Sequence, residues 1–201
     1  MAGSFVMSSD MERACLLVEA LVFASPEPVR LSIIADLLST QGLKIAAAEA
    51  LDAVGERYAT HAIELVEVAG GWQFRTRAEY ASALTKIVEK PRRLSRGAME
   101  TLAIIAYHQP CTRAEIEAIR GVSLGQAILD ALLEDSLIAP KGRKEVPGRP
   151  VLWGTTPVFL ESFGLPDIGS LPKREDFLLD RAPTEAAPDA PSPVGETDGT
   201  G

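Results

Sequence analysis

The chain has little cysteine and histidine, and this shortage restricts the chemistry open to it. Its 201 residues include two cysteines and two histidines. Two cysteines cannot build a disulfide framework, and Cys15 and Cys111 are too far apart for a zinc ribbon or a CxxC redox motif. We therefore expect a reducing compartment, with no metal centre and no cofactor.

Long apolar runs are also missing. The longest runs from residue 14 to residue 24 and is interrupted by Glu19, whereas a transmembrane helix needs about 18 or more apolar residues. The first ten residues carry no basic region of the kind that opens a signal peptide. These two absences predict a cytoplasmic protein without a membrane contact.

The familiar catalytic motifs are absent, because the sequence contains no GxxxxGK[ST], HExxH or GxGxxG. The string GVSLG at 121–125 matches a GxSxG nucleophile elbow, but that motif needs an apolar strand before it, and a charged helical segment precedes it here. Ser123 is better explained as a helix N-cap. His108 and Cys111 are three residues apart, a spacing that two metal ligands can have. Pro110 between them indicates instead that His108 lies at a helix end before a turn. We expect no catalytic residues, and a small hydrolase using Ser123 or Cys111 is the weakest hypothesis.

Acidic residues outnumber basic ones, 28 to 20, for a net charge of −8. Residues 1–90 carry −4, residues 91–165 carry +1 and residues 166–201 carry −5. From Arg181 onward there are four prolines, three glycines and almost no large apolar side chain, which predicts disorder. The bulk charge disfavours non-specific DNA binding, and residues 166–201 are expected to form an acidic, largely disordered tail.

Residues 1–90 contain a helical pattern followed by a β pattern. Ser9 and Glu12 form a candidate capping box. Apolar spacing predicts helices over about 10–24, 31–38 and 44–59. The segments IELVEVA and WQFRT are β-prone and are joined across Gly70-Gly71, a pair typical of a tight hairpin turn.

Residues 91–165 repeat this order, after a linker expected at EKPRRLSRG around Pro91. The first helix is predicted over about 95–107, where Gln109-Pro110 ends it. Thr112 and Glu115 form a capping box for a second helix that ends at Gly121, and Ser123 with Gln126 is predicted to cap a third helix over 123–135. The segment LIAPKGRKEVPGRPVLWGTT then resembles a hairpin, and PVFLESFGL a short helix.

Three helices followed by a hairpin is the winged-helix arrangement. The predicted fold class is therefore α+β, mainly α, with two tandem winged-helix domains at 1–90 and 91–165. Both third helices carry mainly acidic exposed positions, whereas a DNA reader needs cations and amides there. Basic residues gather instead at 86–96 and 141–149, as solvated segments or as a docking surface for an acidic partner or DNA backbone. A winged-helix transcriptional regulator that binds DNA remains the alternative hypothesis.

The first helix of each half is apolar on nearly every face, as the strings CLLVEALVFA and AMETLAIIAY show. Such a helix is either the central core helix of its domain or is covered by another chain. Trp72 and Trp153 follow the two hairpin turns, where each ring covers the core or serves as a partner contact.

The segment RLSRGAMETLAIIAYHQPCTRAEIEAIRGV at 93–122, and the PGRP, GTT and FGL elements within 142–165, carry a family resemblance. The chain resembles the segregation and condensation protein B family over most of residues 12–165. One departure is Trp153, where a tyrosine-like aromatic would be more usual.

The resemblance implies a non-enzymatic subunit of the bacterial condensin-like SMC complex, acting in chromosome condensation and partition during cell division. It implies a homodimer formed through the N-terminal domain. It also implies binding of the central segment of the kleisin, segregation and condensation protein A, and through it the SMC ATPase. The expected location is the cytoplasm near the nucleoid, with DNA contact indirect or weak.

Two sets of contact residues are hypotheses of our own. Leu16, Ala20 and Phe23, on the outer side of the first helix, are predicted to form the dimer interface. Arg143, Arg149 and Trp153, near the second hairpin, are predicted to bind the kleisin, because cations and an aromatic ring suit a partly acidic amphipathic segment.

Overall fold

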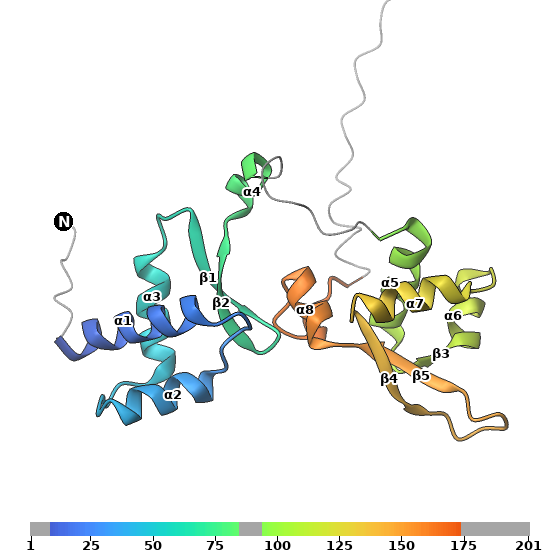
Figure 1. The fold of residues 1–201 in the computed structure, drawn as a ribbon, viewed down its shortest axis with the longest axis horizontal. Coiled ribbons are helices and arrows are strands. Elements are labelled where there is room, and N and C mark those ends of the chain that lie inside the picture. The colour runs from blue at the N-terminus through green and yellow to red at the C-terminus, as the bar shows by residue number, and fades with distance from the viewer. Residues whose placement is uncertain (1–8, 85–93, 174–201) are drawn as a thin grey trace, which may run out of the picture. The chain divides into compact units, whose positions relative to one another are not determined.

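The computed structural model describes residues 9–84, the first half, and residues 94–173, the second half (Figure 1). The fold is mixed α/β and mainly helical. The predicted linker at Pro91, most of the basic cluster at 86–96 and the tail from Arg181 onward lie outside the described residues. No helix in the described ranges has both the length and the apolar character needed to cross a bilayer.

The first half has three helices, a hairpin and a further short helix (Figure 1). Their bounds are α1 Ser9–Ala24, α2 Leu31–Thr40, α3 Ala47–Arg57, β1 Ile63–Val68, β2 Gly71–Thr76 and α4 Ala78–Leu84, the last of which the sequence did not predict. The two strands pair antiparallel, with Val68 opposite Gly71. Side chains from all three long helices form one core, whose fully buried members include Val18, Ile34, Leu38, Leu51 and Val54.

Three details of the first-half prediction are wrong. Ser9 is itself helical and so is not the N-cap of α1. Helix α3 begins at Ala47, three residues after Lys44, and its N-cap, Ala46, makes no side-chain cap bond. The positive φ angles of the hairpin turn belong to Ala69 and Gly70, since Gly71 already opens β2.

Close packing, and not the geometry of the turn, explains why residue 71 is glycine. A Cβ atom on Gly71 would lie 2.8 Å from the carbonyl carbon and oxygen of Pro28. Next to it, Val29 and Trp72 exchange two backbone hydrogen bonds of 2.9 and 2.8 Å. The segment before α2 therefore adds to the edge of the hairpin, and only glycine allows the close approach.

The second half has the same order of helices with one additional strand. Its elements are α5 Arg96–His108, β3 Cys111–Thr112, α6 Arg113–Arg120, α7 Gln126–Glu134, β4 Ile138–Arg143, β5 Val151–Thr155, α8 Pro157–Phe163 and the 3₁₀ turn Ile168–Ser170. The sheet is antiparallel in the order β3-β5-β4, and β3 was missed by the sequence analysis. Its core is separate from that of the first half and includes Leu102, Ile105, Ile116 and Leu132.

Most helix ends of the second half follow the predicted local signals. The Ser95 hydroxyl accepts from the backbone N–H of Ala98. Thr112 and Glu115 form the complete capping box, and Gly121 ends α6 with φ 72°. The predicted capping box and the predicted end of α6 at Gly121 are confirmed, and Ser95 caps a helix that was predicted to start there without a named cap.

The predicted cap of the third helix is wrong. Helix α7 begins at Gln126, its N-cap is Gly125, and no side chain caps it. The Glu117 carboxylate accepts the Leu124 N–H at 2.9 Å, and the Arg113 guanidinium donates to the Leu124 carbonyl. These two side chains from α6 hold the turn extended through Leu124, so the helix starts later than Ser123.

The described chain continues beyond residue 165, where the sequence analysis placed the tail. Leu165 and Leu171 pack against the second core. The backbone N–H groups of Ala69 and Gly70 donate to the carbonyls of Leu165 and Pro166, both at 2.9 Å. The described residues up to Leu171 accordingly group into one compact unit.

Candidate interaction surfaces

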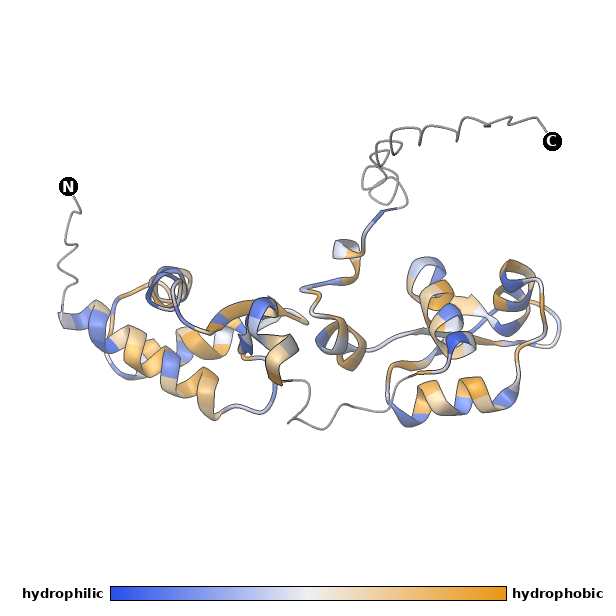
Figure 2. Ribbon diagram, turned by 90° about the horizontal axis from the view of Figure 1, so that it is seen from above, coloured by the Kyte–Doolittle hydropathy of each residue, from blue (hydrophilic) through white to orange (hydrophobic). Residues whose placement is uncertain are grey.

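The three residues predicted for a dimer interface line one groove of the first half. Leu16 is 52% exposed and Phe23 is 81% exposed, the largest value among the exposed large apolar side chains of the described residues. Together with Ala20 they form one wall, and the groove has a volume of about 150 Å³. Figure 2 shows hydrophobic colouring over most of α1 after its hydrophilic first turn. The helix therefore carries more apolar surface than its own core covers.

The other wall of this groove comes from α3 and the hairpin, with Tyr58, Ile63 and Phe74. The Tyr58 and Phe74 rings lie 4.7 Å apart between centroids, at 50°. Burial, followed by a hydrogen bond to the nearby Glu19 carboxylate, raises the pKa of the Tyr58 phenol above its ordinary value of 10. The groove is thus apolar, with one carboxylate, Glu19, at its side.

Ion pairs link α3 to α1 beside the groove. The Arg57 guanidinium lies 2.9 Å from a Glu12 carboxylate oxygen and 3.6 Å from one of Glu19. Both pairs are partly exposed, so each contributes modestly to stability.

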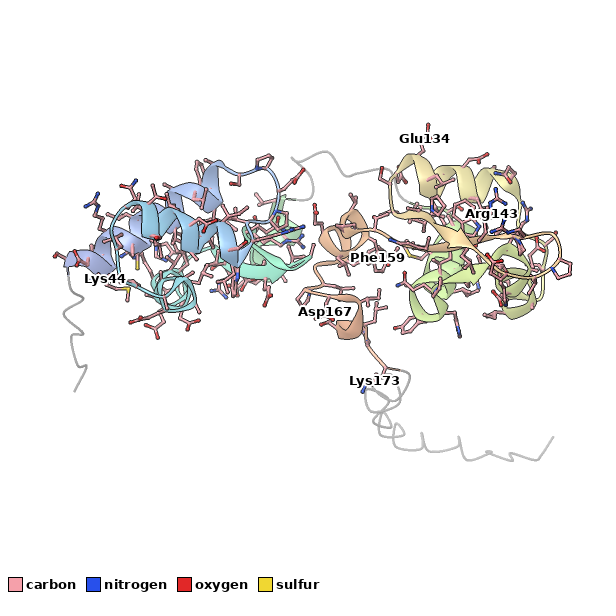
Figure 3. The ribbon with its side chains drawn as sticks, turned by 90° about the horizontal axis from the view of Figure 1, so that it is seen from below. Lys44, Glu134, Arg143, Phe159, Asp167 and Lys173 are labelled. Carbon is pink, nitrogen blue, oxygen red and sulfur yellow. The ribbon has the colours of Figure 1, made fainter. Side chains whose placement is uncertain are left out.

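The second set of predicted contact residues lies on the β4–β5 hairpin. Arg143 donates to the Arg149 carbonyl at 3.0 Å, and Arg149 forms an ion pair of 3.0 Å with Glu145. Figure 3 labels Arg143, which lies in the second half of the molecule. The structure therefore brings the two arginines together, while Glu145 offsets part of their charge.

Trp153 lies in the middle of the same sheet, opposite Cys111 on one side and Pro140 on the other. It is partly buried and packs against the second core. Trp72 packs against the first core in the same way. Both rings therefore contribute to their cores, and each keeps an accessible part.

The loop end of the β4–β5 hairpin is tied to α6. The Lys144 ammonium lies 2.6 Å from the Glu115 carboxylate. Hydrogen bonds from Lys144 and from the N–H and hydroxyl of Thr112 lower the pKa of Glu115 from 4.5 to about 2. The capping box and the hairpin consequently share one carboxylate.

The helices in the third position of each half are poor surfaces for nucleic acid. Helix α3 exposes Glu49, Asp52 and Glu56, and α7 exposes Asp130 and Glu134. Helix α7 contains no lysine or arginine at all. Carboxylates at these positions repel phosphates, so neither helix is suited to reading a DNA groove.

The candidate catalytic residues are not assembled into a site. Ser123 is exposed in the turn before α7, and Cys111 is buried. Burial, with a smaller contribution from Glu115, raises the pKa of the Cys111 thiol and so suppresses the nucleophilic thiolate. His108 is exposed whereas Cys111 faces the core, and no cluster of metal-ligating side chains occurs within 9–84 and 94–173.

A further groove, between the start of α5 and one face of α7, was missed by the sequence analysis. It has a volume of about 240 Å³ and is lined by Leu94, Ser95, Ala98, Ala127, Ile128, Ala131, Glu134 and Asp135. Helical spacing predicts one apolar face for the third helix, made of Leu124, Ala127, Ile128, Ala131 and Leu132. In the structure Leu124 and Leu132 are buried and Ile128 packs against the second core, whereas Ala127 is exposed and Ala131 is half-buried. The sequence signal that could have revealed this groove was the pair Ala127 and Ala131, followed by the adjacent acids Glu134 and Asp135.

Comparisons with known proteins agree on one family. The family model described as segregation and condensation complex subunit ScpB matches residues 16–174. A protein named segregation and condensation protein B from Symbiobacterium thermophilum is 46% identical over 162 residues, covering 80% of this chain and 73% of that protein. One of the same name from Desulforamulus reducens is 41% identical, covering 87% and 96%. The crystal structure of ScpB from Mycobacterium tuberculosis aligns at 30% identity with a TM-score of 0.35, covering 79% of this chain and 99% of the other.

Proposed function

Because the chain belongs to the family of segregation and condensation complex subunit ScpB, we propose that it is a non-enzymatic subunit of the bacterial SMC complex. In this role it binds the kleisin, segregation and condensation protein A, and acts in chromosome condensation and partition in the cytoplasm near the nucleoid. Kleisin binding connects it to the SMC ATPase, and its contact with DNA is indirect or weak. The proposal is supported by the family membership together with the exposed apolar surface of α1 and the basic residues of the β4–β5 hairpin.

Each half is proposed to be a winged-helix domain used for protein contacts. Three helices followed by an antiparallel hairpin support this assignment in both halves. The acidic outer faces of α3 and α7 favour protein contacts over DNA contacts. Sequence-specific, salt-dependent DNA binding by the isolated chain would support the transcriptional-regulator alternative instead.

The α1 groove is proposed to be the homodimer interface. Phe23 is largely exposed and lies beside Leu16 and Ala20 in an apolar groove, and burial of a large apolar side chain contributes about 1.5–3 kcal/mol. We expect Phe23→Asp to give monomers in sedimentation velocity. Ile33→Asp, on α2, is the control, since Ile33 is also exposed and apolar but does not line this groove. A Phe23→Asp protein that remains dimeric would remove the groove from the interface.

The β4–β5 hairpin is proposed to contact acidic residues of the kleisin, through Arg143 and Arg149 and the accessible part of Trp153. Because Trp153 also packs against the core, the clean test is the double charge reversal Arg143→Glu, Arg149→Glu. We expect this variant to co-purify with less kleisin and to give a smaller complex mass by light scattering. Lys44→Glu, an exposed cation of the first half, is the control. Wild-type kleisin yield from the double variant would contradict this placement.

A further inference from the structure

The groove between α5 and α7, called here the acidic groove, has the form of a docking site for a helix. Its floor consists of small side chains, Ala98, Ala127 and Ala131, with Ile128 and Leu94 as larger apolar residues. Small residues allow the backbone of an approaching helix to come close, and apolar side chains of that helix fill such a groove at spacings of three and four residues. Ala127 is exposed and Ala131 is half-buried, so the floor is accessible.

The charge of the groove has one sign. Glu134 and Asp135 are exposed at its rim, and no lysine or arginine lines it. Figure 3 shows the Glu134 side chain pointing away from the body of the second half. Among the described residues, neither carboxylate takes part in any of the ion pairs.

The position of these carboxylates is unfavourable for α7 itself. Glu134 is the last residue of the helix and Asp135 is its C-cap, where the helix dipole already places partial negative charge. No basic residue lies in the last turn to offset them. A lysine or arginine from outside would gain from both side chains and from the negative end of the helix dipole.

The groove is preformed. A Cβ atom on Gly97 would lie 3.2 Å from the Ile128 Cδ1 atom, so the first turn of α5 packs directly on α7. Leu129 and Leu132, on the other side of α7, are buried in the second core. A partner would therefore meet a rigid surface and would order little of this chain on binding.

We propose that the acidic groove binds a helical segment of the kleisin that carries apolar residues three or four positions apart and a lysine or arginine at one end. The apolar residues lie over Ala98, Ala127 and Ala131, and the cation lies between Glu134 and Asp135. This inference rests on the proposed function, since it names a second site for the same partner. The second half then presents two surfaces of opposite charge, a basic hairpin for acidic kleisin residues and the acidic groove for basic ones.

The test is a calorimetric titration of the full chain with purified kleisin. We expect the charge reversal Glu134→Lys, Asp135→Lys to weaken binding by about tenfold or more, since losing close charge pairs at an interface commonly costs that much. Asp130→Lys is the matched control, because Asp130 is an exposed acid of α7 that does not line the groove, and its affinity should stay within about twofold. Ala127→Trp should also weaken binding by filling the groove without changing charge.

The outcomes separate this inference from the proposed function. Weakening by Glu134→Lys, Asp135→Lys and by Ala127→Trp, with Asp130→Lys unchanged, supports the groove. Equal weakening by Asp130→Lys would show a general charge effect and overturn it. Wild-type affinity in all groove variants would also overturn it, while the proposed function would stand. Failure of the wild-type chain to bind kleisin would overturn the proposed function itself.

Discussion

The two halves share an order of elements, but their helix ends are stabilised by different means. In the first half, neither α2 nor α3 has a side-chain cap. In the second half, Ser95, Thr112 and Thr156 all cap helices with their hydroxyls. Helices α2 and α3 therefore depend on burial in the shared core, as does the uncapped α7 of the second half, whereas α5, α6 and α8 are also specified by local hydrogen bonds.

This difference matches the distribution of exposed apolar surface. The first half leaves Leu16 and Phe23 exposed on its central helix, where a second chain can cover them. The second half has a hairpin tied to α6 through Lys144 and Glu115, together with a rigid groove at α7. Our proposals accordingly assign self-association to the first half and partner binding to the second.

The largest effects should come from the two cores and should fall in the same range. Leu51→Ala in the first half and Leu132→Ala in the second each remove a fully buried side chain, at a cost of about 2–5 kcal/mol in the free energy of unfolding. Urea denaturation measures both. A cost below about 1 kcal/mol at either position would show that this half does not depend on its core as described.

A glycine pair probes the packing of the first half. Gly71→Ala should lower the free energy of unfolding by about 1–3 kcal/mol, since its Cβ would overlap the Pro28 backbone. Gly55→Ala, inside α3 with open space around it, should raise it by about 0.5–1 kcal/mol. Thermal unfolding of both variants should move in opposite directions, and a shift of the same sign would contradict the close approach at Gly71.

A pair of hydroxyl deletions tests local capping in the second half. Thr112→Ala removes the capping box of α6 and should cost about 0.5–2 kcal/mol. Ser123→Ala should change stability by less than about 0.5 kcal/mol, because Ser123 caps no helix here. A loss at Ser123 equal to that at Thr112 would restore the cap predicted from the sequence.

The smallest effect is a pH dependence at Glu115. Its pKa is about 2 in the folded chain and 4.5 without its partners. Its contribution to stability is therefore fully present above pH 4.5 and is lost as the pH falls toward 2. Glu115→Gln should have a lower Tm than the wild type at pH 7, and this difference should shrink between pH 4.5 and 2. A difference in Tm that stays constant over this range would show that the charge of Glu115 plays no part.

The local signals of the sequence were sufficient wherever a short-range hydrogen bond sets an element boundary. Thr112 with Glu115, and Gly121, were placed correctly from spacing alone. The predicted N-cap at Ser123 was wrong because Arg113 and Glu117 from α6 bind the backbone of Leu124. Strand β3 was not predicted for a related reason, since its two residues form a strand only by pairing with β5.

The sequence by itself determined the family, the order of the elements and the exposed position of Leu16, Ala20 and Phe23, because these follow from residue types and helical spacing. Only the tertiary structure decided which face of α7 is buried and which faces outward. That choice depends on the packing of α7, whose Leu129 and Leu132 enter the second core while Ile128 lies against Gly97 of α5. The acidic groove is formed by this packing of α5 on α7, which cannot be predicted from the spacing of residues along the sequence.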